Sequence, residues 1–286
     1  MPPLPEASAL TLAQYDVPDS SRLEQIAVEL KRFQKGRVDA RTQGYYDRVQ
    51  RACSWLAKSL RDSHDPESGF IFTWIALNAL CGVRPEVLTT KWWGKERESR
   101  PASTKYQGDD AVPSELEWYL WRVSSFDRDG RVIRGVLEER WDDALTVLRA
   151  RYLMSRYWTW KWRNDDEIEK WKKWGEQAAK DAIGVSPSRA TVYHALCEII
   201  VWRLRTLRNQ IFHGCATDKH SKRRDPGHSE LEAAWLLLGR LVWAFLRLMA
   251  TESARGSYWP PIPFPRAASA QHSRLNPAWL PGAGRA

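Results

Sequence analysis

The segment 70–81 constrains the fold more than any other part of the chain. It reads Phe-Ile-Phe-Thr-Trp-Ile-Ala-Leu-Asn-Ala-Leu-Cys, and Gly82 follows it. A helix of this composition is apolar on nearly every side, so other elements must cover most of its surface. We therefore expect it to be the central helix of the protein.

Signals for further helices recur along the chain. Apolar periodicity and capping patterns predict helices over residues 21–35, 43–63, 114–124, 131–153, 165–181, 186–213 and 229–250. Capping boxes begin three of them, formed by Ser21 with Glu24, Ser114 with Glu117, and Ser229 with Glu232. Internal repeats are absent from the sequence and strand patterns are almost absent. The sequence therefore predicts an all-α fold, an up-and-down helical bundle with additional helices.

The breaks between these helices suggest three regions. Residues 1–40 form an N-terminal arm and helix, residues 41–250 form the helical domain with an insertion at about 83–185, and residues 251–286 form a Pro-rich tail. Because the tail carries six prolines, we expect it to be non-helical, and either extended or disordered.

The spacing of the cysteines and the length of the apolar runs indicate the cellular compartment of the protein. The cysteines are Cys53, Cys81, Cys197 and Cys215, and none forms a C-x-x-C pair, so we expect neither a disulfide framework nor a zinc cluster. The first twenty residues lack the pattern of a signal peptide, and no apolar stretch has the length of a membrane span. We expect a cytoplasmic protein with no membrane partner.

The charge of the chain points toward a phosphate-bearing partner. The formal net charge is +9, which favours polyanions such as RNA over long range. Aromatic and basic residues alternate within 157–174, a composition that suits stacking on single-stranded RNA. The same tryptophans can equally pack the inserted helices onto the bundle, and both interpretations remain open.

Two faces can be distinguished on the helix that ends near residue 213. At 100° per residue, one narrow stripe is apolar and should face the core: Ile200, Leu204, Leu207 and Ile211. A second stripe is polar, because Arg205, Asn209 and His213 are spaced by four residues. Arg208 lies between Arg205 and the apolar edge, and Gly214 ends the helix. A guanidinium, an amide and an imidazole thus point into one sector.

These residue types suit RNA cleavage by the ribose 2′-hydroxyl. Such a reaction needs a base for the hydroxyl proton, an acid for the leaving oxygen and a group that holds the phosphate. Imidazole transfers protons near neutral pH, and guanidinium binds phosphate oxygens while remaining charged. No metal ion and no cofactor is needed, because the substrate carries its own nucleophile. A dimer would bring two such sets into one cleft.

The run Arg208-Asn209-Gln210-Ile211-Phe212-His213 resembles the R-x4-6-H signature of the HEPN superfamily, including the polar residue that often follows its arginine. The segment 70–82 is similar to the buried helix of those proteins. The resemblance covers about 43–82 and 186–250, with 83–185 matched only as inserted helices.

The resemblance implies a homodimeric, metal-independent endoribonuclease that leaves a 2′,3′-cyclic phosphate. It assigns His213 as the acid and base, Arg208 as the phosphate-binding group and Asn209 as the positioning group. Many bacterial members are toxins or act in antiviral defence, so an antitoxin or regulatory protein partner is expected. One subgroup carries a modified tyrosine two residues after the histidine, where this chain has Cys215.

Further candidates and alternatives accompany this hypothesis. Candidate contacts to the RNA backbone are Arg205, Lys219, Lys222, Arg223 and Arg224, although the loop residues among them can equally be a solvated charge run. We interpret Asn78, His194 and His228 as structural. His213 can also serve only as a cation at a helix end. The alternative functions are a catalytically inactive HEPN-like module that binds a nucleotide or a protein, and a helical adaptor with no nucleic-acid role.

Overall fold

The computed structural model describes residues 4–14, 16–35, 40–61, 64–82, 115–154, 165–212, 228–255, 257 and 259. Within these residues the protein is all-α, as predicted, and contains no strand. The α-helices are α1 (Glu6–Ala13), α2 (Ser20–Gln34), α3 (Ala40–Arg61), α4 (Pro66–Cys81), α7 (Glu115–Ser124), α8 (Arg131–Glu139), α9 (Trp141–Arg149), α10 (Asp165–Ala182), α11 (Arg189–Leu196), α12 (Arg205–Phe212), α13 (His228–Ala250) and α14 (Glu252–Arg255). A 3-10 turn η1 (Arg151–Leu153) and a π-helix η4 (Cys197–Leu204) complete the description.

Two helical predictions are wrong in detail. The single helix expected over 131–153 is divided into α8 and α9, because Arg140 leaves helical geometry with φ −110° and ψ 34°. Neither proline nor glycine marks this break. Helix α2 is capped by Asp19 rather than by a box beginning at Ser21, since the Asp19 carboxylate accepts a hydrogen bond from the backbone N–H of Arg22 at 2.8 Å.

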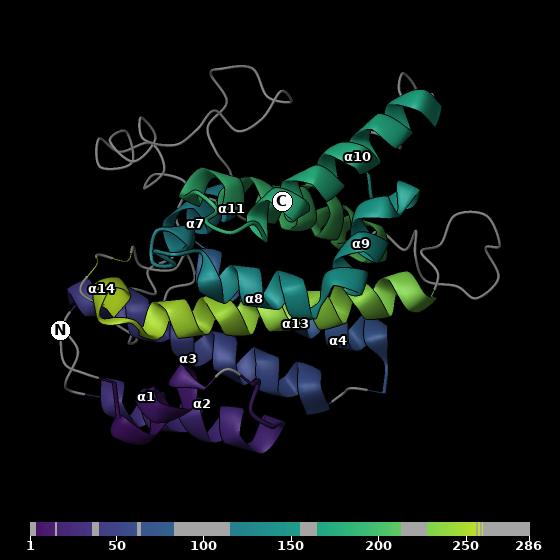
Figure 1. The fold of residues 1–286 in the computed structure, drawn as a ribbon. Coiled ribbons are helices and arrows are strands. Elements are labelled where there is room, and N and C mark those ends of the chain that lie inside the picture. Colours follow the sequence, from purple (N-terminus) through teal and green to yellow (C-terminus); the bar gives the residue numbers. More distant parts are fainter. Residues whose placement is uncertain are drawn as a thin grey trace, which may run out of the picture.

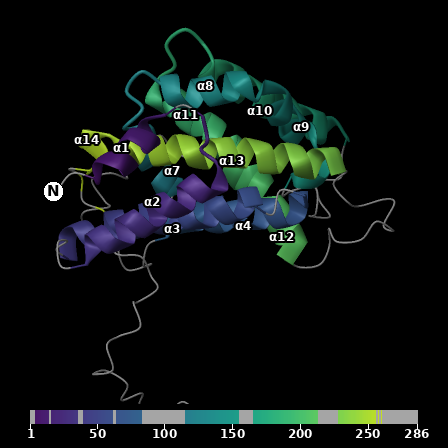
Figure 2. The ribbon, with the colours of Figure 1, turned by 90° about the horizontal axis from the view of Figure 1, so that it is seen from below.

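Helix α13 lies at the centre of the protein. Figures 1 and 2 show it between a layer containing α3 and α4 and a layer containing α8, α9 and α10. The expectation that 70–81 would be the central helix is therefore wrong. Helix α4 returns along α3 instead, with Gly69, Phe70, Thr73 and Leu77 buried. Residues Ile71, Phe72 and Ile75, on its other side, are only half-buried.

The expectation that no apolar stretch has the length of a membrane span is wrong for α13. Within the described residues, Ser229–Ala250 is long and apolar enough to cross a membrane when judged by length and composition alone. However, 78% of its most apolar window is buried inside the protein. Its position between two helical layers accounts for this composition, because a helix that is covered on most sides must be apolar over most of its surface.

A glycine permits a close contact between α4 and α13. A Cβ atom at Gly69 would lie 2.6 Å from the Trp235 ring, so only glycine leaves room for the indole. The Trp235 Nε1–H donates to the Ser59 hydroxyl at 2.8 Å. The Ser59 and Thr73 hydroxyls lie 2.7 Å apart, and each lies 2.8 Å from the carbonyl oxygen of Gly69. These buried polar groups join α3, α4 and α13 at one point.

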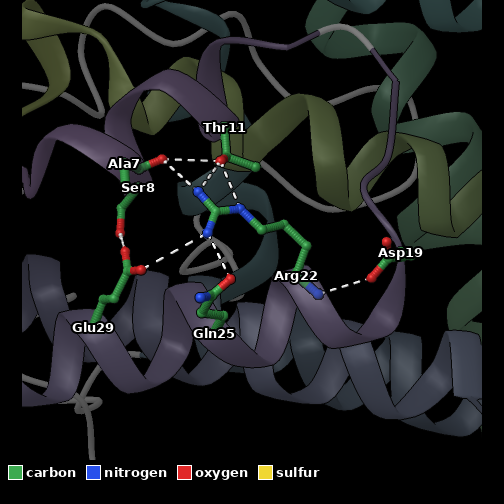
Figure 3. A network of polar contacts seen from close by, with 7 residues as sticks. All are labelled: Ala7, Ser8, Thr11, Asp19, Arg22, Gln25 and Glu29. Carbon is green, nitrogen blue, oxygen red and sulfur yellow. Dashed lines mark hydrogen bonds and ion pairs between the residues drawn. The ribbon is translucent and has the colours of Figure 1, made fainter.

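The N-terminal helices are held by a network around Arg22, drawn in Figure 3. The Arg22 guanidinium donates to the carbonyl oxygen of Ala7 at 3.1 Å and to the Thr11 hydroxyl at 2.8 Å, which fastens α1 to α2. Ser8 completes the contact by donating to the Glu29 carboxylate at 2.7 Å. The apolar residues of α1 and α2 belong to the same core as α3 and α13: Leu12, Leu23, Ile26 and Leu30.

The expectation that the tail contains no helix is wrong at its beginning. Helix α14 follows α13, and Trp259 is only 1% exposed. The Trp259 Nε1–H donates to the carbonyl oxygen of Ala254 at 2.9 Å. The guanidinium carbons of Arg122 and Arg48 lie 5.0 and 5.9 Å from the indole centroid, so buried cations flank this ring. The six prolines follow Trp259 and lie outside the described residues, so the expectation for that part of the tail stays a prediction.

The contact at Gly69 gives a stability prediction. We expect Gly69→Ala to lower the free energy of unfolding by about 1–3 kcal/mol, because the new methyl group collides with the Trp235 ring. Chemical denaturation followed by circular dichroism measures this loss.

Gly239→Ala in α13 is the matched control, since a Cβ at Gly239 meets no atom within 4 Å. There we expect a gain of about 0.5–1 kcal/mol from the lower entropy of the unfolded chain. Equal effects of the two substitutions would contradict the packing described at Gly69.

Candidate functional site

The helix predicted over 186–213 is built from three consecutive segments, α11, η4 and α12. It begins at Ser188, whose hydroxyl accepts a hydrogen bond from the backbone N–H of Thr191 at 3.1 Å. The prediction of its apolar stripe is confirmed, because Ile200, Leu204 and Leu207 are fully buried and Ile211 is 7% exposed. Core packing therefore fixes the rotation of α12 about its axis.

The π-helix η4 holds a buried ion pair. Arg203 Nη1 lies 3.2 Å from Glu198 Oε2, and the two side chains are 1% and 11% exposed. Residues five apart meet on a π-helix, whose hydrogen bonds run from i to i+5. Arg203 Nη2 also donates to the carbonyl oxygen of Trp171 in α10 at 3.3 Å. The pair thus anchors the segment before α12 to a neighbouring helix.

A pocket of about 420 Å³ lies where α12 meets α4 and α7. This is within the size range of small-ligand sites. Its lining residues are Trp74, Asn78, Cys81, Glu115, Leu116, Arg205, Arg208 and Asn209. Figure 2 places α12 beside the end of α4. Three of the residues singled out in the sequence, Arg205, Arg208 and Asn209, therefore line one pocket.

The α12 wall of the pocket is cationic. Arg208 is half-buried, and its Nη1 donates to the Asn209 side-chain oxygen at 3.0 Å. The Arg208 guanidinium carbon also lies 4.5 Å from the ring centroid of Phe212, a cation–π contact that restricts the side chain. Arg205 is exposed to solvent. Two guanidinium groups and an amide can bind the oxygens of a phosphate.

The opposite wall contributes Asn78 from α4 and Glu115 from α7. The interpretation of Asn78 as a structural residue within an apolar helix did not anticipate its exposure in the pocket. Glu115 was not singled out at all. It begins α7, and its proximity to α4 depends on tertiary structure that no local pattern encodes. Trp74 and Leu116 add apolar surface to this wall, and they are 5% and 8% exposed.

A buried cation lies behind this wall. Arg48 is fully buried, and desolvation lowers its pKa to about 10 although the charge of Glu115 acts in the opposite direction. Arg48 Nη1 donates to the carbonyl oxygen of Leu80 at 2.7 Å. Burial also raises the pKa of the Cys81 thiol to about 12, so Cys81 is not a thiolate nucleophile near neutral pH.

Several candidates lie outside the described residues. These are the predicted acid and base His213, the loop cations Lys219, Lys222, Arg223 and Arg224, and Cys215. His194 is half-buried beside Tyr193, with ring centroids 6.1 Å apart, and burial lowers its pKa.

The tryptophan-rich segment is described only in part. Trp171 is 7% exposed and packs with Met154 and Ile168, while Trp174 is partly buried against them. This favours packing for these two rings, and residues 157–164 lie outside the described part.

Comparisons with known proteins give no assignment. No protein-family model, curated protein or solved structure matches this chain. In the described part of the chain, no group of three or more His, Cys, Asp or Glu residues is arranged to hold a metal ion. Any inference about function therefore rests on the pocket and on the motif in the sequence.

The ion pair in η4 gives a second stability prediction. We expect Arg203→Ala to lower the free energy of unfolding by about 3–5 kcal/mol, because it leaves the Glu198 carboxylate buried without its cation. Urea denaturation measures the loss.

The control is Arg149→Ala, which removes an ion pair with Glu176 at 2.9 Å in which the arginine side chain is 56% exposed. Water screens such a pair, so we expect Arg149→Ala to lower the free energy of unfolding much less than Arg203→Ala does. Similar losses in the two variants would contradict the role given to the buried pair.

Proposed function

We propose that this chain is a HEPN-like, metal-independent endoribonuclease that leaves a 2′,3′-cyclic phosphate. The observation that carries the proposal is the pocket where Arg205, Arg208 and Asn209 meet. His213 follows directly after Phe212, the last residue of α12. The side chains proposed to bind the phosphate thus lie on one helix, and a histidine follows that helix directly in the sequence.

The proposed reaction needs no added reactant. The ribose 2′-oxygen attacks the adjacent phosphorus while a base removes its proton. The bond from phosphorus to the 5′-oxygen breaks, and an acid protonates that oxygen as it leaves. Arg208 and Arg205 offset the negative charge that grows on the phosphate, and Asn209 orients Arg208 through their hydrogen bond. His213 supplies the proton transfers.

The proposal includes a homodimer. Cleavage uses a base and an acid at the same time, and one chain offers one histidine in this motif. A second copy facing the first supplies the other. We further propose a cytoplasmic toxin or antiviral-defence effector, controlled by an antitoxin or another regulatory protein, since an unregulated ribonuclease would damage its own cell.

An RNA cleavage assay in the presence of EDTA tests the reaction. We expect the wild-type protein to cut RNA and to leave 2′,3′-cyclic phosphate ends, which end-group analysis identifies. His213→Ala and Arg208→Ala should each lower the rate by at least about 100-fold, because they remove the proton-transfer group and the phosphate-binding group.

Arg131→Ala is the matched control, because Arg131 belongs to α8, is 77% exposed and does not line the pocket. Its activity should equal that of the wild type. Unchanged cleavage by folded His213→Ala protein would refute the proposal. Binding of RNA without any cleavage would favour the inactive HEPN-like module instead.

A further inference from the structure

A second pocket, of about 330 Å³, opens beside the central helix α13. It is separate from the pocket beside α12, because the two share no lining residue among those that the structure describes. Its volume is within the size range of small-ligand sites. Its apolar lining comes from the linker between α1 and α2, from α3 and from α13: Val17, Leu56, Leu60, Trp235 and Leu236.

Gly239 in α13 leaves room in this second pocket. A Cβ atom at Gly239 would meet no atom within 4 Å, whereas a Cβ at Gly69 would collide with Trp235. Glycine destabilises the middle of a helix relative to alanine, and at Gly239 no neighbouring atom requires it. The absent side chain instead provides open space in the pocket, which a bound molecule can occupy.

Four of the lining residues are charged, and they belong to a chain of ion pairs. Arg240 lies between Asp16, at 4.0 Å, and Glu139. Arg140 lies 3.5 Å from Glu139 and 3.5 Å from Asp143. The chain therefore begins and ends with a carboxylate. Its three acids and two arginines leave one negative charge in excess.

The two ends of this chain indicate which charge a ligand should carry. The Asp16 side chain is 94% exposed and lies 4.0 Å from Arg240, so its carboxylate can approach a cation. At the other end, burial raises the pKa of Asp143, Arg140 opposes this rise, and the charges of Asp142 and Glu232 add to it. Further carboxylates thus lie near that end, and the excess negative charge favours a cation.

We propose that this second pocket binds a small organic cation, an amine with an apolar body. The body occupies the open space at Gly239 against Leu236 and Trp235, and the ammonium group pairs with Asp16. An anion of similar size would have to displace a carboxylate that already pairs with Arg140 or Arg240. Binding at this pocket does not require the ribonuclease function.

Ligand-detected NMR titration tests the inference with three probes that share an indole body. Tryptamine carries an ammonium group, tryptophol is neutral, and indole-3-propionate is an anion. We expect the wild type to bind tryptamine about 3- to 10-fold more tightly than tryptophol, and indole-3-propionate more weakly than either. Equal affinities, tighter binding of the anion, or no binding of tryptamine would overturn the inference.

A charge substitution tests the place of the ammonium group. Asp16→Asn should weaken tryptamine binding by about 2- to 5-fold and leave tryptophol binding unchanged, because it removes only the charge. Asp129→Asn is the matched control, since the Asp129 side chain is 69% exposed and does not line this pocket. It should change the binding of neither probe. Equal effects of the two substitutions would contradict the pairing with Asp16.

A substitution at Gly239 tests the place of the apolar body. Gly239→Leu should weaken both tryptamine and tryptophol by at least about 10-fold, because its side chain fills the space that the indole needs. Its Cβ enters open space, so the variant should fold, and its melting temperature checks this. If it does not fold, Gly239→Ala replaces it with an expected loss of about 2-fold. Unchanged tryptamine affinity in the folded variant would place the binding site elsewhere and overturn the inference.

Discussion

The close approach of α13 to α4 at Gly69 is the contact on which the rest of the structure depends. The absence of a side chain at this glycine lets the Trp235 indole lie against the α4 backbone and donate to Ser59 on α3. Three helices are thereby fixed to one another through fully paired polar groups, and such buried networks specify a single arrangement of the core. Because Trp74 and Asn78 lie further along α4, this contact also fixes one wall of the pocket.

The opposite wall is fixed independently, by the ion pair in η4. Arg203 binds both Glu198 and the backbone of α10, so the segment before α12 has a defined register and a defined neighbour. The pocket therefore lies between two elements that are each held by buried interactions. A site of this kind loses little conformational freedom when a ligand binds, which favours tight and selective binding.

Local chemistry could be predicted from the sequence, and contacts between distant segments could not. The apolar stripe of Ile200, Leu204 and Leu207 follows from helical geometry alone, and it correctly orients Arg205 and Arg208 away from the core. Glu115 could not be found this way, because residues 83–114 separate it in sequence from α4. The burial of Trp259 likewise could not be predicted, because its ring packs against Trp118, Tyr119 and Phe126, which lie more than 130 residues away in the sequence.

The position of the arginines on α12 also affects the electrostatics of the proposed phosphate site. Arg205, Arg208 and Asn209 belong to the last two turns of a long helix, where the helix dipole is negative and opposes a bound anion. That field is equivalent to only about half a negative charge and falls off within the last turn, so even one guanidinium outweighs it. The contact of Arg208 with the Phe212 ring holds its charge near the pocket, whereas the exposed Arg205 can meet a ligand from the solvent side. In the proposed phosphate site, the paired arginines of α12 thus add net attraction for an anion in spite of the helix dipole.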